Sequence, residues 1–191
     1  MVIALFSQEI NESVSEVIQS FLTSKFSKDS KFFIEKKLLS EIKYNNKLDI
    51  IPFNKSKDLY SEIDLMVSIG GDGTFLRTIE YVRDLAIPVM GINTGNLGFL
   101  ATIKKENLDQ AIDKIYNRKF KIENRSLIKV NSDEIGLPKS FFPYALNEVS
   151  VVRKDTTSMI NIKTSLDGSN LNTYWADGLI VSTPTGSTGY S

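Results

Sequence analysis

The residues best suited to chemistry follow a short apolar run and form the turn Gly70-Gly71-Asp72-Gly73. Glycines in a turn allow positive φ and close approach of a ligand to the backbone. The helix expected after them offers free N–H groups that suit phosphate. Asp72 could accept a proton from a hydroxyl near that phosphate, but an Asp or Thr here could equally do no more than cap the helix. The turn matches neither the phosphate loop that ends in Gly-Lys-Ser/Thr nor the GxGxxG pattern, which disfavours a dehydrogenase.

Two further segments carry groups that could recognise a nucleotide. The loop from Gly91 to Leu100 has three glycines with Asn and Thr, and can present backbone amides. Its Phe99 either lines an aromatic pocket or packs in the core. Adjacent Asn147 and Glu148 interrupt an apolar run, and their donors and acceptors could read an adenine edge and sugar hydroxyls. The same pair is equally consistent with a strand end where both side chains reach water.

The last segment runs from Asp177 to Tyr190 and joins an acidic residue, an apolar strand and a cluster of hydroxyl side chains. The chain has no histidine, so it contains no Ser-His-Asp or Cys-His arrangement. The hydroxyls therefore lack the usual base that would make one a nucleophile, and hydrogen bonding to a polar ligand is the better interpretation. Any acid–base chemistry falls to a carboxylate, lysine or tyrosine.

The composition is that of an ordinary globular protein. Of 191 residues, 41% are hydrophobic and 24% charged, and Lys+Arg equals Asp+Glu at 23 each. This balance disfavours a general nucleic-acid binder. Cysteine is absent, so there is no disulfide frame and no thiolate metal site. No apolar run approaches the ~18 residues that a membrane helix needs. We expect a cytoplasmic protein with no nucleic-acid or membrane partner.

The pattern of apolar residues changes near residue 124, which predicts two domains, 1–124 and 125–191. In the first, strand-like runs alternate with helical patterns, and this predicts an α/β domain with a parallel sheet and flanking helices. Ser13 and Glu16 form a candidate capping box for the first helix, and residues 32–39 fit a strand or a helix equally. In the second, alternating residues around the turn Asp167-Gly168 predict an antiparallel β region. The clearest helical face consists of Val14, Val17, Ile18, Phe21 and Leu22.

The four segments, in this order and at these separations, resemble the NAD kinase family. The family's GGDG signature matches residues 70–73, its NTGxLGFL run matches residues 93–100, its Asn-Glu pair matches residues 147–148, and its DGxxxSTPTGSTxY segment matches residues 177–190. GGDGT alone also occurs in lipid kinases and phosphofructokinases, but the four together are specific. The resemblance covers the chain from about Asp64 to its end. It implies an α/β domain, a β domain and a ligand cleft between them, with the antiparallel domain incomplete because family members continue further.

The resemblance also implies a role for individual residues. Asp72 would be the general base toward the ribose 2′-hydroxyl, and no metal ligand is assigned. The phosphate-binding residues would be Gly70, Gly71, Gly73 and Thr74. The NAD-binding residues would be Asp72, Gly73, Phe99, Leu100, Asn147, Glu148, Asp177, Thr185, Thr188, Gly189 and Tyr190.

The implied reaction is phosphoryl transfer from ATP to NAD, giving NADP, in a homo-oligomer (a dimer or tetramer). Mg²⁺ or another divalent cation would bridge the triphosphate, and NAD would be a substrate rather than a hydride carrier. Two alternatives remain at this point: a lipid kinase that shares GGDGT, and a nucleotide-sensing module without turnover. The Asn147-Glu148 pair and the loop to Tyr190 favour NAD over a lipid.

Overall fold

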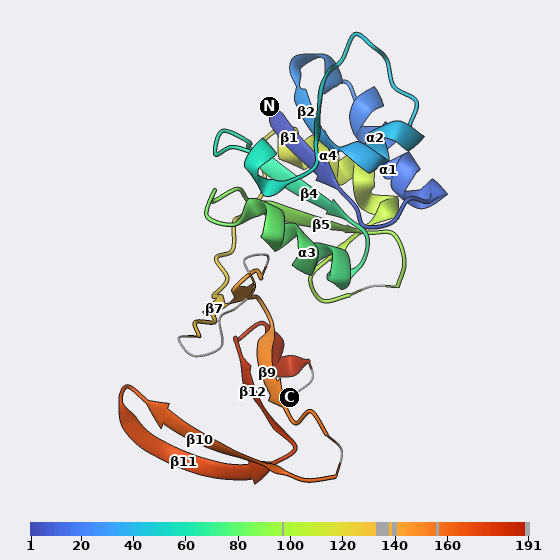
Figure 1. Ribbon diagram of the computed structural model, residues 1–191. Coiled ribbons are helices and arrows are strands. Elements are labelled where there is room, and N and C mark those ends of the chain that lie inside the picture. The colour runs from blue at the N-terminus through green and yellow to red at the C-terminus, as the bar shows by residue number, and fades with distance from the viewer. Residues whose placement is uncertain (97, 133–137, 139–140, 156, 190–191) are drawn as a thin grey trace. The chain divides into compact units, whose positions relative to one another are not determined.

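The computed structural model describes residues 1–96, 98–132, 138, 141–155 and 157–189. The chain divides into two compact units, Met1–Ile122 (unit 1) and Glu123–Ser191 (unit 2) (Figure 1). The boundary expected after residue 124 lies close to this division. Within the described residues, no helix has both the length and the apolar character needed to cross a membrane.

Unit 1 is built on a six-stranded sheet in the order β3-β2-β1-β4-β5-β6, with every neighbouring pair parallel (Figure 1). From β1 the chain moves outward to β2 and β3, then returns to the other side of β1 to form β4. The order therefore reverses between β1 and β4. The strands are β1 (Val2–Phe6), β2 (Lys31–Glu35), β3 (Asp49–Phe53), β4 (Leu65–Ile69), β5 (Val89–Asn93) and β6 (Ile103–Lys104).

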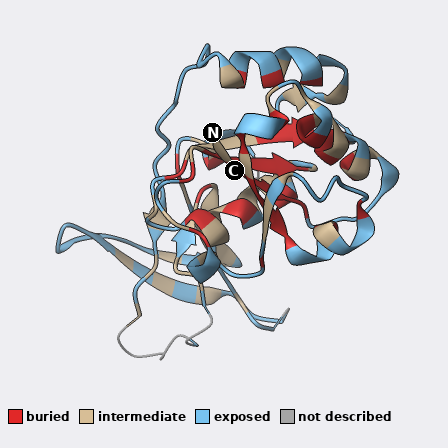
Figure 2. Ribbon diagram, turned by 90° about the horizontal axis from the view of Figure 1, so that it is seen from above, coloured by how far each residue is buried: buried red, intermediate tan, exposed pale blue. Residues whose placement is uncertain are grey.

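Helices cover both faces of this sheet, as the sequence predicts. Along β1, Ile3 and Leu5 join the core under α1, α2 and α4, whereas Ala4 and Phe6 join the core on the face of α3. Figure 2 shows the buried residues gathered in the strands and on the inner sides of the helices. The helices are α1 (Glu12–Thr23), α2 (Lys36–Glu41), α3 (Asp72–Val82) and α4 (Leu108–Tyr116).

The first helix confirms the predicted face but not the predicted cap. Its five predicted apolar residues are buried. The cap, however, is Asn11, whose side-chain oxygen accepts a hydrogen bond from the N–H of Val14 at 3.0 Å. The predicted capping box of Ser13 and Glu16 is wrong, because Asn11 already satisfies the third N–H of the helix and leaves Ser13 inside the first turn.

Residues 32–39, which fit either a strand or a helix, form both. Strand β2 ends at Glu35, and α2 begins at the next residue. The buried Glu35 carboxylate accepts hydrogen bonds from the N–H groups of Lys37 and Leu38, at 3.0 and 3.3 Å. One side chain thus ends the strand and caps the helix.

Unit 2 consists of small antiparallel pairs, which confirms the predicted β region. Strands β10 and β11 form a hairpin, and its turn residues Asp167 and Gly168 have φ of 49° and 81°, the positive values that a tight hairpin turn requires. Strand β9 pairs with β12, with Glu148 opposite Ser182. The strands are β7 (Ile128–Lys129), β8 (Tyr144–Ala145), β9 (Glu148–Val152), β10 (Ile160–Leu166), β11 (Ser169–Ala176) and β12 (Gly178–Ser182).

Candidate functional site

The GGDG turn connects the fully buried strand β4 to α3. Gly70 has φ of 147°, and a Cβ at this position would lie 2.5 Å from Oγ1 of Thr74, so the turn requires glycine here. The N–H of Gly70 donates to the carbonyl of Ile92 on the neighbouring strand at 2.9 Å. Gly71 caps α3 without a side-chain hydrogen bond, and Asp72 is the first residue of the helix. The alternative in which Asp72 only caps this helix is therefore wrong.

The carboxylate of Asp72 instead binds the backbone of the second glycine loop. Oδ2 accepts from the N–H of Phe99 at 2.8 Å, and Oδ1 accepts from Leu100 at 2.9 Å and Ala101 at 3.0 Å. Two of the four motifs, 27 to 29 residues apart in the chain, thus meet at one carboxylate. The side chain links the start of α3 to the loop after β5.

These contacts set the charge state of Asp72. Partial burial raises the pKa of this carboxyl, but the N–H groups of Ala101, Phe99 and Leu100 together outweigh burial and hold its pKa below the ordinary 3.8. The group is therefore ionised at neutral pH. A carboxylate stabilised in this way is a weak base.

The loop that holds Asp72 is shaped by a glycine and an asparagine. A Cβ at Gly98 would lie 2.2 Å from Oδ1 of Asp72, so a larger residue would displace either the carboxylate or the loop. The buried Asn93 donates from Nδ2 to the carbonyl of Asn96 and accepts from the N–H of Gly95, both at 2.8 Å. Sequence reasoning did not assign Asn93 this role. The sequence pattern that could have indicated this role is an Asn followed two residues later by Gly. In this pattern the Asn side chain commonly accepts a hydrogen bond from the backbone N–H two residues further along the chain.

The aromatic residue of the same loop faces solvent. Phe99 is 85% exposed, and Leu100 is half-buried. The alternative in which Phe99 packs in the core is therefore wrong. An exposed phenylalanine next to an ionised carboxylate is available for contact with a flat, apolar ligand surface.

Unit 2 brings the third and fourth motifs together around Thr183. The N–H of Thr183 donates to the carbonyl of Asn147 at 2.8 Å, and its hydroxyl donates to the carbonyl of Leu146. The same hydroxyl accepts from the N–H groups of Thr185 and Gly186, at 3.1 and 3.2 Å. Thr183 is 4% exposed and was not a predicted site residue. The sequence pattern that could have indicated this role is a Ser/Thr followed by Pro and Gly. This pattern is typical of a turn in which the hydroxyl accepts hydrogen bonds from backbone N–H groups further along the chain.

The polar pair of the third motif lies at the beginning of β9. Asn147 immediately precedes the strand and Glu148 begins it, and both are half-buried. A Cβ on Gly186 would lie 2.2 Å from the carbonyl oxygen of Asn147, so the hydroxyl-rich segment packs directly on the pair. The pair and this segment form one surface of unit 2.

The other predicted residues of unit 2 lie near basic side chains or in solvent. Oδ1 of Asp177 forms an ion pair with Nη1 of Arg153 at 3.1 Å, and Oγ1 of Thr185 accepts from Nη1 of Arg125 at 3.2 Å. Sequence reasoning assigned neither arginine a role. Thr188 and Gly189 are exposed, and Tyr190 lies outside the described residues. Among the described residues, no group of three or more acidic side chains comes together that could hold a metal ion.

Family models place both parts of the chain in one family. The model for the ATP-NAD kinase N-terminal domain matches residues 7–120, and the model for the ATP-NAD kinase C-terminal domain matches residues 146–191. The NAD kinase of Christiangramia forsetii is 42% identical, over all of this chain and 66% of the relative. The NAD kinase of Bacteroides fragilis is 44% identical, over 81% of this chain and 51% of the relative. The chain thus spans two thirds or less of the length of these curated relatives.

Solved structures agree on the fold. The structure of yeast NADH kinase complexed with NADH has a TM-score of 0.84 at 21% identity, over 99% of this chain and 59% of that one. An NAD kinase from Archaeoglobus fulgidus in complex with ATP has a TM-score of 0.66 at 28% identity, over all of this chain and 64% of that one. With two domain models in the expected order, and with all four motifs in place, the chain belongs to the NAD kinase family.

Proposed function

We propose that this protein is an NAD kinase, which transfers the terminal phosphoryl group of ATP to the 2′-hydroxyl of the adenosine ribose of NAD. The observation that carries the proposal is the ionised Asp72 at the start of α3, held by the loop that presents Phe99. It combines a phosphate-binding helix terminus with a hydroxyl acceptor. The names of the relatives support the same activity, and the ATP bound by the A. fulgidus enzyme supports the donor.

In the proposed reaction, the ribose 2′-oxygen attacks the terminal phosphorus of ATP. The new oxygen–phosphorus bond forms as the bond to the leaving ADP breaks, and the hydroxyl proton passes to Asp72. The first N–H groups of α3, which have no acceptor within the helix, stabilise the phosphate oxygens. Gly71 and Gly73, where an added Cβ would have no neighbour within 4 Å, leave the backbone open to that phosphate, and Gly70 and Thr74 complete the proposed phosphate-binding set.

The low pKa of Asp72 is compatible with this role. The transition state of phosphoryl transfer is loose in most analyses, so the attacking hydroxyl keeps most of its proton until late, and positioning matters more than base strength. Oδ2 of Asp72 accepts from the N–H of Phe99 alone, whereas Oδ1 accepts from Leu100 and Ala101, so Oδ2 can accept a further hydrogen bond from the substrate hydroxyl.

The dinucleotide is proposed to bind through the remaining predicted residues. Asn147 and Glu148 would hold the adenine edge and sugar hydroxyls, and Phe99 with Leu100 would contact the adenine. Asp177, Thr185, Thr188, Gly189 and Tyr190 would complete the contacts. Arg153 and Arg125 fix the positions of Asp177 and Thr185 in unit 2.

A divalent cation is part of the proposal only as a companion of the donor. No three acidic side chains converge among the described residues, so they do not build a protein cage for a metal. Mg²⁺ needs no such cage, because it commonly binds substrate phosphates with one or two carboxylates and several waters. Such an ion would neutralise charge on the triphosphate. A homo-oligomeric state and a cytoplasmic location remain predictions from the sequence.

The direct test is to incubate the intact protein with ATP, Mg²⁺ and NAD and to measure NADP with an NADP-specific dehydrogenase. We expect NADP to form with ADP in equal amounts. A parallel reaction with NADH shows which redox form is accepted, and one with diacylglycerol tests a lipid acceptor. Tight NAD binding without any NADP would instead indicate a sensing module.

A further inference from the structure

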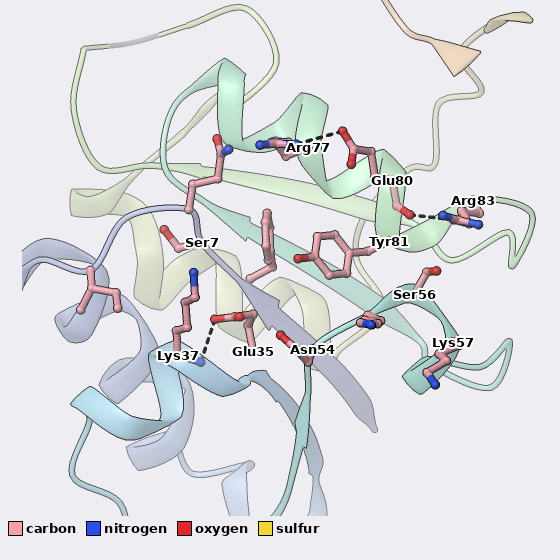
Figure 3. Close-up of a pocket in the computed structure, with 14 residues that line it drawn as sticks. Ser7, Glu35, Lys37, Asn54, Ser56, Lys57, Arg77, Glu80, Tyr81 and Arg83 are labelled. Carbon is pink, nitrogen blue, oxygen red and sulfur yellow. Dashed lines mark hydrogen bonds and ion pairs between the residues drawn. The ribbon is translucent and has the colours of Figure 1, made fainter. Parts of the chain in front are cut away.

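A concave surface of unit 1 lies on the α3 side of the sheet, and none of the predicted site residues lines it. It is a pocket of about 690 Å³ lined by segments that follow β1, β2 and β3 and by one side of α3 (Figure 3). Its walls include Ser7, Glu35, Asn54 and Tyr81. It therefore adjoins the carboxyl ends of the strands, next to the reversal of strand order between β1 and β4. In open α/β sheets ligands bind at this position.

The pocket is positively charged in a chain whose formal net charge is zero. Two acidic side chains, Glu35 and Glu80, line it. Five basic side chains surround them, so the lining carries an excess of three positive charges. The five are Lys37, Lys55, Lys57, Arg77 and Arg83.

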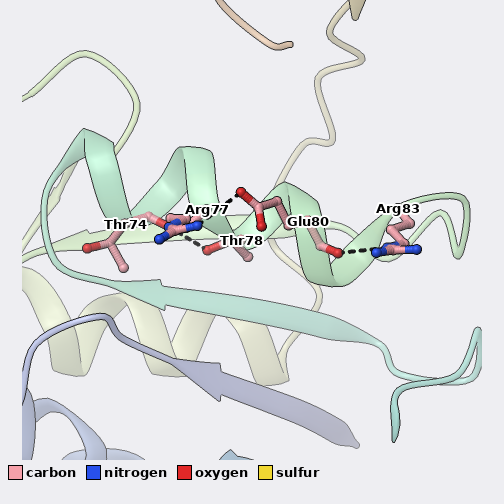
Figure 4. A network of polar contacts seen from close by, with 5 residues as sticks. All are labelled: Thr74, Arg77, Thr78, Glu80 and Arg83. Atoms are coloured by element: carbon pink, nitrogen blue, oxygen red, sulfur yellow. Dashed lines mark hydrogen bonds and ion pairs between the residues drawn. The ribbon is translucent and has the colours of Figure 1, made fainter. Parts of the chain in front are cut away.

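Both acidic side chains already have partners. Glu35 accepts hydrogen bonds from the first turn of α2. Oε1 of Glu80 pairs with Nη1 of Arg77 at 3.3 Å, and the carbonyl of Glu80 accepts from Nε of Arg83 at 3.0 Å (Figure 4). These contacts hold the two arginines along α3. The acids therefore orient the basic groups or cap a helix, and they do not cancel the charge of the lysines.

Among the described residues, no carboxylate lies within ion-pair distance of Lys37, Lys55 or Lys57. Asp58 is the acidic residue next to Lys57, and its Oδ2 accepts from the N–H groups of Asn54 and Lys55, both at 2.9 Å. The Asp58 carboxylate thus stabilises the turn after β3, and it forms no ion pair with the ammonium group of Lys55 or Lys57. Several cations that form no ion pair suit a ligand that carries several negative charges.

Two aromatic side chains, Phe6 and Tyr81, line the pocket. Their ring centroids lie 4.6 Å apart, and the ring centroid of the buried Phe53 lies 5.7 Å from that of Tyr81. Burial, and then the charges of Glu35 and Glu80, raise the pKa of the Tyr81 hydroxyl, so it stays protonated and can donate. A pocket lined by both aromatic and basic side chains suits a phosphorylated compound with an organic ring better than it suits a simple inorganic anion.

The pocket also lies within reach of the proposed chemistry. Arg77 is five residues beyond Asp72 on α3, which corresponds to about 7.5 Å along the helix axis. A polyphosphate chain can cover that distance. A donor bound along the pocket would place its terminal phosphate at the start of α3, where Asp72 begins the helix.

We propose that this basic pocket binds the polyphosphate of the nucleoside triphosphate donor. The inference rests on the proposed kinase function and adds to it a donor site separate from the GGDG turn. Lys55 and Lys57 contact the inner phosphates, and Arg77 holds the phosphate nearest Asp72. The same chemistry would fit a free polyphosphate that acts as an effector, so the test must separate these two ligands.

The test compares two double variants of the intact protein. Lys55→Ala with Lys57→Ala removes two exposed cations of the pocket. Lys28→Ala with Lys47→Ala removes two exposed lysines of unit 1 that do not line the pocket.

Calorimetric titration at low salt measures the Kd of inorganic tripolyphosphate, and steady-state kinetics measure the KM of ATP and of NAD. We expect the first variant to weaken tripolyphosphate binding about tenfold or more and to raise the KM of ATP similarly, with the KM of NAD unchanged. The second variant should match the parent.

The outcomes separate the pocket from the kinase function. Unchanged tripolyphosphate affinity in the first variant overturns the proposed site. Weaker tripolyphosphate binding with an unchanged KM of ATP overturns it as well, because the pocket then serves another anion. If the parent forms no NADP, the kinase proposal fails on its own. The pocket can then still be tested by competition between tripolyphosphate and a non-hydrolysable ATP analogue. If the pocket binds the nucleotide, the two ligands compete in the parent, and this competition is lost in the first variant.

Discussion

The two units hold their functional residues by different means. Unit 1 places Asp72 just after β4, in a sheet that lies between two apolar cores, and every member of these cores lies before residue 117. In unit 2, Leu146 is the buried apolar residue among those described, while Trp175 is 74% exposed and Leu171 60%. There the predicted ligand residues are held by strand pairing and by the hydrogen bonds of Thr183. Hydrophobic packing holds the strands and helices that carry the proposed catalytic carboxylate. In unit 2, strand pairing and hydrogen bonds hold the proposed binding groups.

Deleting one large side chain from each unit gives the largest contrast. Phe21 is completely buried in α1, so Phe21→Ala should lower the free energy of unfolding by about 3–5 kcal/mol. Trp175→Ala removes an equally bulky but exposed ring and should change it by less than about 0.5 kcal/mol. Urea denaturation followed by circular dichroism measures both. A large loss from Trp175→Ala would show that unit 2 has an apolar core of its own around β11.

Asp72→Asn tests the carboxylate as a reacting group. Turnover should fall by about 10² or more, the usual weight of general base catalysis. The variant should also lose some stability, because the amide NH₂ cannot accept from the loop N–H groups that Asp72 binds. NADP formation and the melting temperature are measured together. A variant that melts early but turns over normally would give Asp72 a structural role alone.

Glu148→Ala tests the proposed NAD-binding residues of unit 2. Losing one hydrogen-bonding partner of a half-buried ligand group costs about 1–3 kcal/mol, so NAD affinity should fall roughly tenfold to a hundredfold. Calorimetric titration with NAD measures it, and Glu148→Gln distinguishes the charge from the hydrogen bonds. Because β9 and β12 pair through their backbones, the substitution should leave the far-ultraviolet circular dichroism unchanged. Equal affinity in parent and variant would place the side chain outside the ligand's reach.

The smallest expected effect is the dependence of stability on pH. The folded-state pKa of Asp72 lies below its ordinary 3.8, so its contribution to stability is present above that value and is lost as the pH falls through the folded pKa. The difference in unfolding free energy between parent and Asp72→Asn should therefore be constant above about pH 5 and shrink below about pH 4. Denaturation at several pH values measures it. A difference that grew on acidification would contradict the lowered pKa.

Local patterns were enough to predict most of the fold. Apolar spacing located the face of α1, and Asp167-Gly168 located the hairpin turn, because both signals lie within a few residues. Residues 32–39 were ambiguous because the change from strand to helix falls inside the run, at Glu35. Strand β3 was not predicted, since Pro52 lowers the strand preference of a short segment.

The composition of the site could be predicted, but its contacts could not. The motifs named Asp72 and the loop through Phe99, yet nothing in their spacing shows that one carboxylate accepts three N–H groups of that loop. The basic pocket was missed for the same reason. Its walls come from four segments between Phe6 and Arg83, and no window of sequence contains them together.

The edges of the sheet in unit 1 determine whether the sheet can grow. At one edge, Pro52 in β3 has no N–H to offer an incoming strand, and the exposed Asp49 adds a charge. At the other edge, β6 consists of Ile103 and Lys104 alone, too short to serve as a template. Both ends of the ladder are thus protected against aggregation by strand addition. Association between copies through this unit would have to use helices or loops, and would leave the six-stranded sheet closed to further strands.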